Sequence, residues 1–294
     1  MSVRPHFFKT YSRLGMINVP HKGTKLNLGV EDGSDSVITK EFLRHFSNPR
    51  VTAYKFPLPQ DIKESDYQKT IAQLSKKFAE LVNTSLSPNE TQVVVGGDHS
   101  VAFGSLLAVL TRMDPASVGY IQFDSHGDVH LFKTSPSGNF HGMWLRPFID
   151  EFDSPGIAAV VPSSLKPGQI MFIGNLELED EEKKVFASKK IINITSDDLS
   201  KNKLVSLAHI RKFIEKFNHI YISFDIDVFN RKLVSATGTP AENGFWPDEV
   251  FDVLDILSHA KRKSIDLVEV NPHRENSRAT IEMAQKVLLR LVNN

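Results

Sequence analysis

The stretch VGYIQFDSHGD, residues 118–128, indicates both the fold class of this 294-residue chain and the place of its chemistry. It joins a continuous apolar run, 118–123, to polar side chains at alternate positions, Asp124, His126 and Asp128. A run of residues as apolar as this one is typical of a strand buried on both faces of a parallel sheet. In extended backbone, side chains two residues apart point the same way, so the three polar groups could converge on one centre.

Further apolar runs alternate with amphipathic helical runs, which is the pattern of an α/β protein with a parallel sheet. The other predicted strands are residues 92–95, 169–173, 219–224 and 264–270. One helix is predicted from apolar residues at spacings of three and four, namely Tyr67, Ile71, Leu74, Phe78 and Leu81. Four more helices are predicted over residues 101–113, 205–217, 248–257 and 279–291, the last capped by Ser277.

No repeat, low-complexity tract or linker interrupts the chain, so we expect one domain over residues 1–294. The segment 130–140 is rich in Ser, Pro and Gly. In an open α/β sheet, a loop that follows a strand borders the ligand crevice. We therefore expect this loop beside the functional site.

The composition excludes several classes of protein. Lys plus Arg and Asp plus Glu both total 35, so there is no surplus charge to attract nucleic acid or an anionic membrane. No apolar stretch is long enough to cross a bilayer, and residues 1–20 lack the apolar centre of a secretory signal, so we expect a cytoplasmic protein. Without cysteine, disulfides, thiolate metal sites and sulfur nucleophiles are excluded.

Two more polar clusters stand at the ends of predicted strands. GGDHS (residues 96–100) follows the first strand and places His99 after a glycine turn, and SFDID (residues 223–227) ends another, with Asp225 and Asp227 on one face. With Asp124, His126 and Asp128, these clusters supply four carboxylates and two imidazoles. An α/β fold gathers its chemistry at such strand ends.

Buried carboxylates repel one another unless cations neutralise them, so the clusters favour a metal site. Four carboxylates suit two ions better than one, because bridging oxygens can hold a metal pair. An oxygen-rich, sulfur-free ligand set favours manganese or another hard divalent ion. The alternative is that each aspartate caps a helix or a turn. This explanation is poor, because three clusters occur in similar settings.

The three clusters resemble the metal motifs of the ureohydrolase family, which comprises arginases, agmatinases and formimidoylglutamases. The resemblance extends from GVEDG (29–33) to EVNP (269–272) and covers most of the chain in the family's order. SGNFHG (137–142) and ATGTP (236–240) are closest to the arginase branch. The resemblance implies a three-layer α/β/α fold with a central, mostly parallel sheet, and a homo-oligomer such as a trimer or hexamer.

The resemblance also implies roles for individual residues. One manganese ion would be held by His99, Asp124, Asp128 and Asp225, and the other by Asp124, His126, Asp225 and Asp227. Asp124 and Asp225 would bridge the two ions. The implied catalytic residues are His141, Glu269 and Asp128. The implied substrate contacts are His130, Ser137, Asn139, Glu179, Glu182 and Thr239.

The chemistry of a guanidinium substrate fits these residue types. Because a guanidinium is resonance-stabilised and cationic, it needs a stronger nucleophile than neutral water, and metal ions can lower the pKa of water from about 15.7 toward 7. Glu269 ends an apolar strand, where a lone carboxylate is costly unless it meets a cation, so we assign it to the guanidinium; pairing with Lys or Arg is the alternative. His141 has the usual pKa of about 6.5 for a proton donor to the leaving amine, although it could be a plain surface histidine.

Departures from the family pattern fall mainly on substrate recognition. His130 replaces an asparagine, Glu179 replaces an aspartate, and Leu176 replaces an arginine. Ser125 stands where alanine is usual, and Glu242 and Asn243 differ beside the metals. The leading hypothesis is hydrolysis of arginine to ornithine and urea. The alternatives are another ureohydrolase activity, on agmatine, formimidoylglutamate or a related compound, and a metal-binding protein without catalysis.

Overall fold

The computed structural model describes residues 4–16 and 27–292. Its centre is an eight-stranded sheet in the order β2-β1-β3-β8-β7-β4-β5-β6, and every neighbouring pair is parallel. The strands are β1 (Arg4–Tyr11), β2 (Arg50–Lys55), β3 (Glu90–Val95), β4 (Val118–Phe123), β5 (Ile170–Ile173), β6 (Ile192–Ile194), β7 (His219–Asp225) and β8 (Lys263–Val268). The predicted parallel α/β sheet is confirmed.

All five predicted strands are present, and they form β3, β4, β5, β7 and β8. The prediction missed β1, β2 and β6. β2 and β6 are the sheet edges, where β2 alternates between half-buried and exposed residues and β6 has only three residues. β1 is buried, but it includes polar side chains that break the apolar run, among them His6 and Thr10.

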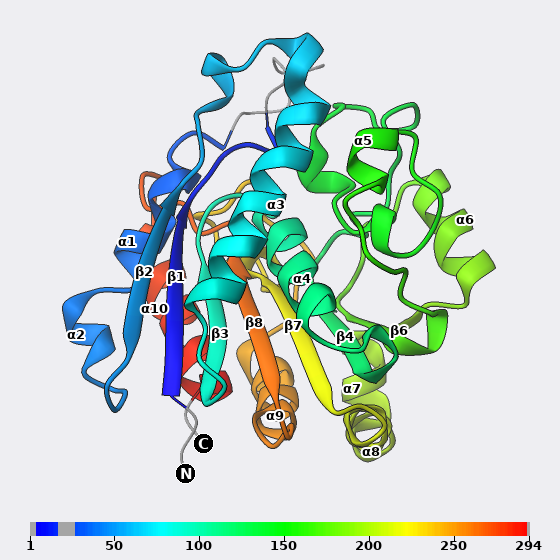
Figure 1. The fold of residues 1–294 in the computed structure, drawn as a ribbon. Helices are drawn as coiled ribbons and strands as arrows, with labels where there is room; N and C mark the ends of the chain where they lie inside the picture. The colour runs from blue at the N-terminus through cyan, green and yellow to red at the C-terminus, as the bar shows by residue number, and fades with distance from the viewer. Residues whose placement is uncertain (1–3, 17–26, 293–294) are drawn as a thin grey trace.

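Helices cover both faces of the sheet and complete three layers (Figure 1). One face packs against α3 (Tyr67–Ser85), α4 (Val101–Arg112), α5 (Pro155–Ala158) and α6 (Asp180–Lys189). The other packs against α1 (Gly33–Val37), α2 (Lys40–Leu43), α7 (Ser196–Lys201), α8 (Lys203–Glu215), α9 (Pro247–Ser258) and α10 (Ser277–Val292). A separate apolar core fills each interface, which explains why the central strands are apolar on both faces.

The predicted helix ends were correct within a few residues. The prediction for Ser277 was wrong, because α10 begins at Ser277 itself and this residue is therefore not its N-cap. The last predicted strand was also too long, since β8 ends at Val268 and Glu269 adopts a left-handed φ of 65°. Over residues 4–16 and 27–292, no helix has the length and apolarity needed to span a membrane.

The sheet order explains how distant polar clusters meet. β3, β8, β7 and β4 are consecutive neighbours in the sheet, although β3 and β8 lie far apart in the sequence. Because all four strands are parallel, their carboxyl ends lie at one edge. The segments that follow these strands carry the metal-binding residues predicted from the sequence and Glu269.

Candidate metal centre

His99 reaches the centre through a turn that needs glycine. Gly96 and Gly97 follow β3 with φ values of 97° and 82°, a region that residues with a Cβ atom rarely adopt. A Cβ atom on Gly96 would also collide with Ser34. The turn directs the imidazole of His99 toward the ends of β4 and β7, and His99 is only 2% exposed.

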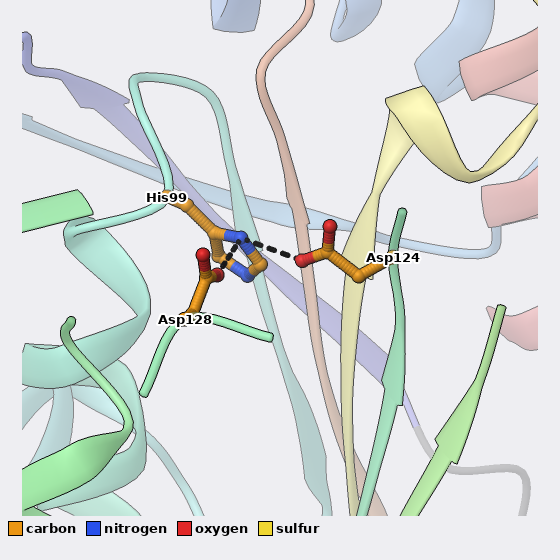
Figure 2. A group of neighbouring side chains, drawn as sticks. All are labelled: His99, Asp124 and Asp128. Atoms are coloured by element: carbon orange, nitrogen blue, oxygen red, sulfur yellow. Dashed lines mark ion pairs between the residues drawn. The ribbon is translucent and has the colours of Figure 1, made fainter. Parts of the chain in front are cut away.

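His99 is surrounded by carboxylates from two other segments. Its Nδ1 lies 2.9 Å from Oδ2 of Asp128, 3.2 Å from Oδ2 of Asp124 and 3.2 Å from Oδ2 of Asp225. Figure 2 shows the contacts of His99 with Asp124 and Asp128, the two aspartates that follow β4. Ligands about 2.1 Å from an octahedrally coordinated cation are roughly 3 Å apart, so these separations fit donors arranged around one ion.

A second group of donors lies beside the first. Nδ1 of His126 is 3.3 Å from Oδ1 of Asp124 and 3.2 Å from Oδ2 of Asp227. Asp124 therefore presents one oxygen to each group, as expected of a bridging carboxylate. For Asp225, Oδ2 faces His99 while Oδ1 accepts the backbone amide of Asp227 at 2.9 Å, so its bridging role stays a prediction.

Tight backbone turns bring these donors together. The sequence had instead suggested that alternate residues of extended strands would do so. Asp128 has a left-handed φ of 55°, and Asp227 lies in the 3₁₀ turn Ile226–Val228 beyond the end of β7. All six predicted ligands converge, but Asp128 and Asp227 do not lie in extended strands as predicted. Tight turns after the strands place the side chains.

The donor set fits two hard divalent cations. The four aspartates and His99 are buried, whereas the side chain of His126 is 33% exposed. Burial raises the pKa of Asp225 well above its usual value, with Asp227 and Asp124 adding to the effect. Burial opposes protonation of His99, yet Asp128 and the neighbouring carboxylates raise its pKa well above the usual value. Negative charge is therefore in excess, and cations that displace the protons would neutralise it.

Polar side chains behind the ligands fix their orientation. Nε2 of His99 lies 2.9 Å from Oγ of Ser223, which leaves Nδ1 to face the aspartates. Trp144 Nε1 donates to Oδ2 of Asp128 at 2.9 Å. Gln122 Nε2 donates to Oδ2 of Asp124 at 2.6 Å and to Oδ2 of Asp128 at 3.1 Å.

No role was predicted for these supporting residues. Gln122 and Ser223 are polar residues that lie between apolar neighbours in β4 and β7, and both are fully buried. Because a buried polar group needs a partner, that position was the signal that could have identified them. Trp144 gave no such signal, since it lies outside the strands.

A pocket of about 270 Å³ opens above the two donor groups. All the predicted catalytic and substrate-binding residues line it, namely Asp128, His130, Ser137, Asn139, His141, Glu179, Glu182, Thr239 and Glu269. The loop 130–140 supplies one wall, as predicted. Thr239 was predicted to contact the substrate. Its Oγ1 donates instead to Oδ2 of Asp227 at 3.1 Å, so this threonine supports a predicted metal ligand.

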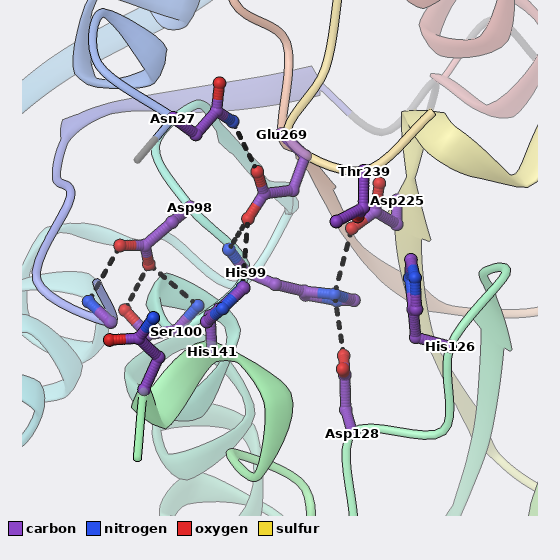
Figure 3. Close-up of polar contacts among 12 residues, drawn as sticks. Asn27, Asp98, His99, Ser100, His126, Asp128, His141, Asp225, Thr239 and Glu269 are labelled. Atoms are coloured by element: carbon purple, nitrogen blue, oxygen red, sulfur yellow. Dashed lines mark hydrogen bonds and ion pairs between the residues drawn. The ribbon is translucent and has the colours of Figure 1, made fainter. Parts of the chain in front are cut away.

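Glu269 presents its carboxylate to the pocket within a frame of hydrogen bonds (Figure 3). Its Oε1 accepts the backbone amide of His99 at 2.8 Å, and its Oε2 accepts Nδ2 of Asn27 at 2.8 Å. Burial, and then Asp98, raises the pKa of Glu269 to about 8. Among the described residues no Lys or Arg forms an ion pair with Glu269. The alternative prediction, that Glu269 pairs with a Lys or an Arg, therefore does not hold for these residues.

His141 lies next to Glu269, with Nδ1 3.8 Å from Oε1 of the glutamate. Burial, together with the positive charges of His126 and His99, lowers the pKa of His141 to about 4. The ordinary pKa assumed from sequence therefore does not apply. A neutral imidazole at this position is suited to accept a proton before it donates one.

The far wall of the pocket is formed by His130, Glu179 and Glu182. Nε2 of His130 lies 3.4 Å from Oε2 of Glu179 and 3.7 Å from Oε2 of Glu182. Glu182 is 4% exposed and burial raises its pKa to about 7, whereas the side chain of Glu179 is 54% exposed. Of the two carboxylates, Glu182 is held rigidly, because its oxygens accept the backbone amides of Val129 and Glu179.

The other departures from the family pattern have identifiable contacts. Ser125 Oγ donates to the backbone oxygen of Asp227 at 2.9 Å, so this serine supports the turn that carries a ligand. Glu242 pairs with Arg231 at the surface, and the backbone oxygen of Asn243 accepts Nδ2 of Asn175 at 2.6 Å. None of these three residues lines the pocket.

Comparisons with known proteins identify the family of this chain. The family model described as "Arginase family" matches residues 12–293. An arginase of Entamoeba histolytica is 26% identical over 90% of this chain and 93% of its own length, and an arginase of Bacillus caldovelox is 30% identical over 74% and 73%.

Solved structures show the same fold. The arginase of Entamoeba histolytica in complex with L-ornithine superposes with a TM-score of 0.86 at 23% identity, covering 100% of this chain and 99% of that one. A formimidoylglutamase of Bacillus subtilis gives a TM-score of 0.70 at 17% identity, covering 99% and 87%. With a family match across nearly its whole length and a two-group site of aspartates and histidines, the chain belongs to the arginase family of hydrolases that act on guanidino or amidino carbon–nitrogen bonds.

Proposed function

We propose that this chain is an arginase, which hydrolyses L-arginine to L-ornithine and urea at a pair of manganese ions. The observation that supports the proposal most directly is the position of Glu269, a buried carboxylate without a Lys or Arg partner among the described residues, in the pocket above the six metal-binding side chains. A guanidinium can satisfy such a carboxylate with two parallel N–H donors. Two hard divalent cations would supply the polarisation that makes water nucleophilic at neutral pH.

In this proposal His99, Asp124, Asp128 and Asp225 would hold one ion, and Asp124, His126, Asp225 and Asp227 would hold the other. Glu269 binds the guanidinium and fixes its carbon over the metal centre, while His99 and Asn27 hold the carboxylate still. Water adds to the guanidinium carbon and the bond to the side-chain nitrogen of the substrate breaks. His141, neutral at rest, accepts the proton released from water and delivers it to the leaving amine.

The amino-acid end of the substrate is assigned to the outer part of the pocket. Ser137, Asn139 and His130 are proposed to contact the α-carboxylate, and Glu182 and Glu179 the α-amino group. Thr239 is proposed to act on this site mainly through its bond to Asp227.

Urea release from the manganese-loaded protein tests the proposal. We expect about two metal ions per chain, urea from arginine, and loss of urea release in Glu269→Gln with metal content retained. Glu282→Gln is the matched control, because this exposed glutamate on α10 pairs with Arg278 outside the pocket. Metal binding without turnover on any guanidino or amidino compound would instead support a non-catalytic metal-binding protein.

A second candidate is a related ureohydrolase with a different substrate. The observation in its favour is His130, whose imidazole faces two glutamates where the arginase branch has an asparagine. Assays with agmatine and formimidoylglutamate beside arginine separate the candidates. Activity confined to a compound without an α-carboxylate would replace the arginase assignment.

We also propose that the chain forms a homo-oligomer, as the family resemblance implies, and that it acts in the cytoplasm. Light scattering after size-exclusion chromatography tests the first proposal, with a mass about three or six times 33.0 kDa as the expected result. Cell fractionation with a specific antibody tests the second.

A further inference from the structure

A second and larger cavity, of about 640 Å³, lies at the opposite end of the sheet from the metal centre. It is bounded by the first residues of β3, β7 and β8, whose other ends carry the metal site (Figure 1). The carboxyl ends of α3, α4, α9 and α10 complete its wall. The volume is within the range of pockets that hold small organic ligands.

The cavity is lined by four cationic side chains, from Arg112, Lys261, Arg262 and Lys263. Among the described residues that line it, Glu90 is the single carboxylate. Glu90 is already engaged by Arg4 and by Arg50, whose Nη1 lies 3.0 Å from Oε2. The negative charge of Glu90 is therefore neutralised by arginines that do not line the cavity. The lining keeps an excess of positive charge.

Arg112 and Lys263 are half-buried and have only neutral partners. Arg112 donates to Asn83 at 2.8 Å, to Gln92 at 2.7 Å and to Ser264 at 3.3 Å, which uses three of the five N–H groups of a guanidinium. Lys263 donates to the backbone oxygen of Ser258 at 2.6 Å. Neither cation forms an ion pair with any residue in the described ranges.

Both cations are destabilised by this environment. Burial lowers the pKa of Arg112 to about 10 and that of Lys263 to about 8. A buried charge without a counter-charge carries a large desolvation cost, which a bound anion would offset.

His219 at the start of β7 adds a further hydrogen-bonding group. It is 5% exposed, its Nε2 lies 3.0 Å from Oγ of Ser264, and its Nδ1 has no partner among the described residues. Burial lowers its pKa to about 3, with Arg112 and Arg262 contributing. The two arginines therefore direct positive potential toward the same wall of the cavity.

The ends of the helices account for only part of this charge. Four helices end at the cavity, α3, α4, α9 and α10, and a helix carboxyl terminus carries about half a negative charge. These ends together amount to about two negative charges, against four cationic side chains. A net positive excess remains after the helix dipoles are counted.

We propose that this cavity binds a small molecule that carries two or more negative charges as phosphate or carboxylate groups. The forked N–H groups of Arg112 and Arg262 suit the paired oxygens of either group, and Lys263 supplies a point charge beside them. The site is independent of the proposed arginase activity, since it shares no residue with the metal centre.

Calorimetric titration of the metal-loaded protein with inorganic phosphate, and separately with succinate, tests the proposal at constant ionic strength. We expect saturable binding of at least one of them, and the ligand that binds more tightly identifies the preferred oxyanion. The double variant Arg262→Gln, Lys263→Gln should raise the dissociation constant about fivefold or more. The thermal midpoint of the wild type should rise with the same ligand, because ligands stabilise the state that they bind.

The double variant Lys76→Gln, Lys77→Gln is the matched control for lost surface charge, since both lysines are exposed on α3 outside the cavity. It should bind both anions as the wild type does. Absence of binding of both anions to the wild type would overturn the proposal. Equal affinity of the wild type and the double variant would also overturn it, because the anion would then bind elsewhere, for example at the metal centre.

Discussion

The side-chain amide of Gln122 donates to Oδ2 of Asp124 at 2.6 Å and thereby fixes a carboxylate that faces both donor groups of the metal centre. The same nitrogen reaches Asp128, and the hydroxyl of Tyr120 donates to Oε1 of Gln122. A glutamine whose amide is held in this way can present its N–H groups to the carboxylates in only one orientation.

Replacing Gln122 by leucine should weaken metal binding by about tenfold to a hundredfold, because the carboxylates lose the donors that orient them. Competition with a metal chelator measures this affinity directly. Gln169→Leu is the matched control, since Gln169 is also buried but donates to the backbone oxygens of Pro115 and Val118. If both variants retained wild-type metal affinity, Gln122 would have only a packing role.

Glu182→Gln should raise the KM for arginine about tenfold with a smaller effect on kcat, because the α-ammonium group loses a rigid, charged partner. Glu179→Gln should change KM by about twofold or less, since its side chain is 54% exposed and solvent screens it. Steady-state kinetics of the two variants give the comparison. The reverse ranking would assign the α-amino contact to Glu179.

Gly174→Ala should destabilise the protein by about 3 kcal/mol, because a Cβ atom there would overlap the backbone oxygen of Asp124. Urea unfolding measures the change. Gly168→Ala is the control, as no atom lies within 4 Å of a Cβ atom at that position, and its stability should stay within about 0.5 kcal/mol of wild type. An unchanged unfolding midpoint in Gly174→Ala would show that the β4 and β5 ends can separate.

His219 should make the protein less stable as the pH falls below its ordinary pKa. Burial lowers its pKa in the folded state to about 3 from 6.5, so on acidification the unfolded chain takes up a proton that the folded chain does not. The free energy of unfolding therefore decreases as the pH falls through the window between 6.5 and 3, by about 1.4 kcal/mol at pH 5.5 from this group.

Urea unfolding of the wild type and of His219→Gln at pH 7.5 and pH 5.5, in a buffer without phosphate, measures the contribution. The loss on acidification should be smaller in the variant by about 1 kcal/mol, since the glutamine does not titrate. Equal losses in the two proteins would mean that His219 is protonated in the folded state.

The sequence by itself determined the central strands, the five longest of the helices that cover them and the polar clusters that converge at the strand ends. It could do so because strands buried on both faces need continuous apolar runs, and because aspartates and histidines at the ends of such runs have few uses other than binding cations. Two of the three strands that it missed, β2 and β6, lie at the edges, where solvent removes the requirement for apolar residues.

Only the tertiary structure decided how the donors meet and what holds them. The left-handed backbone of Asp128 and the 3₁₀ turn at Asp227 replaced the strand alternation inferred from sequence. The bond between Asn27 and Glu269 joins residues 242 positions apart, and no local pattern encodes it. Such contacts depend on the order of strands in the sheet, which follows from how the whole chain packs rather than from any single segment.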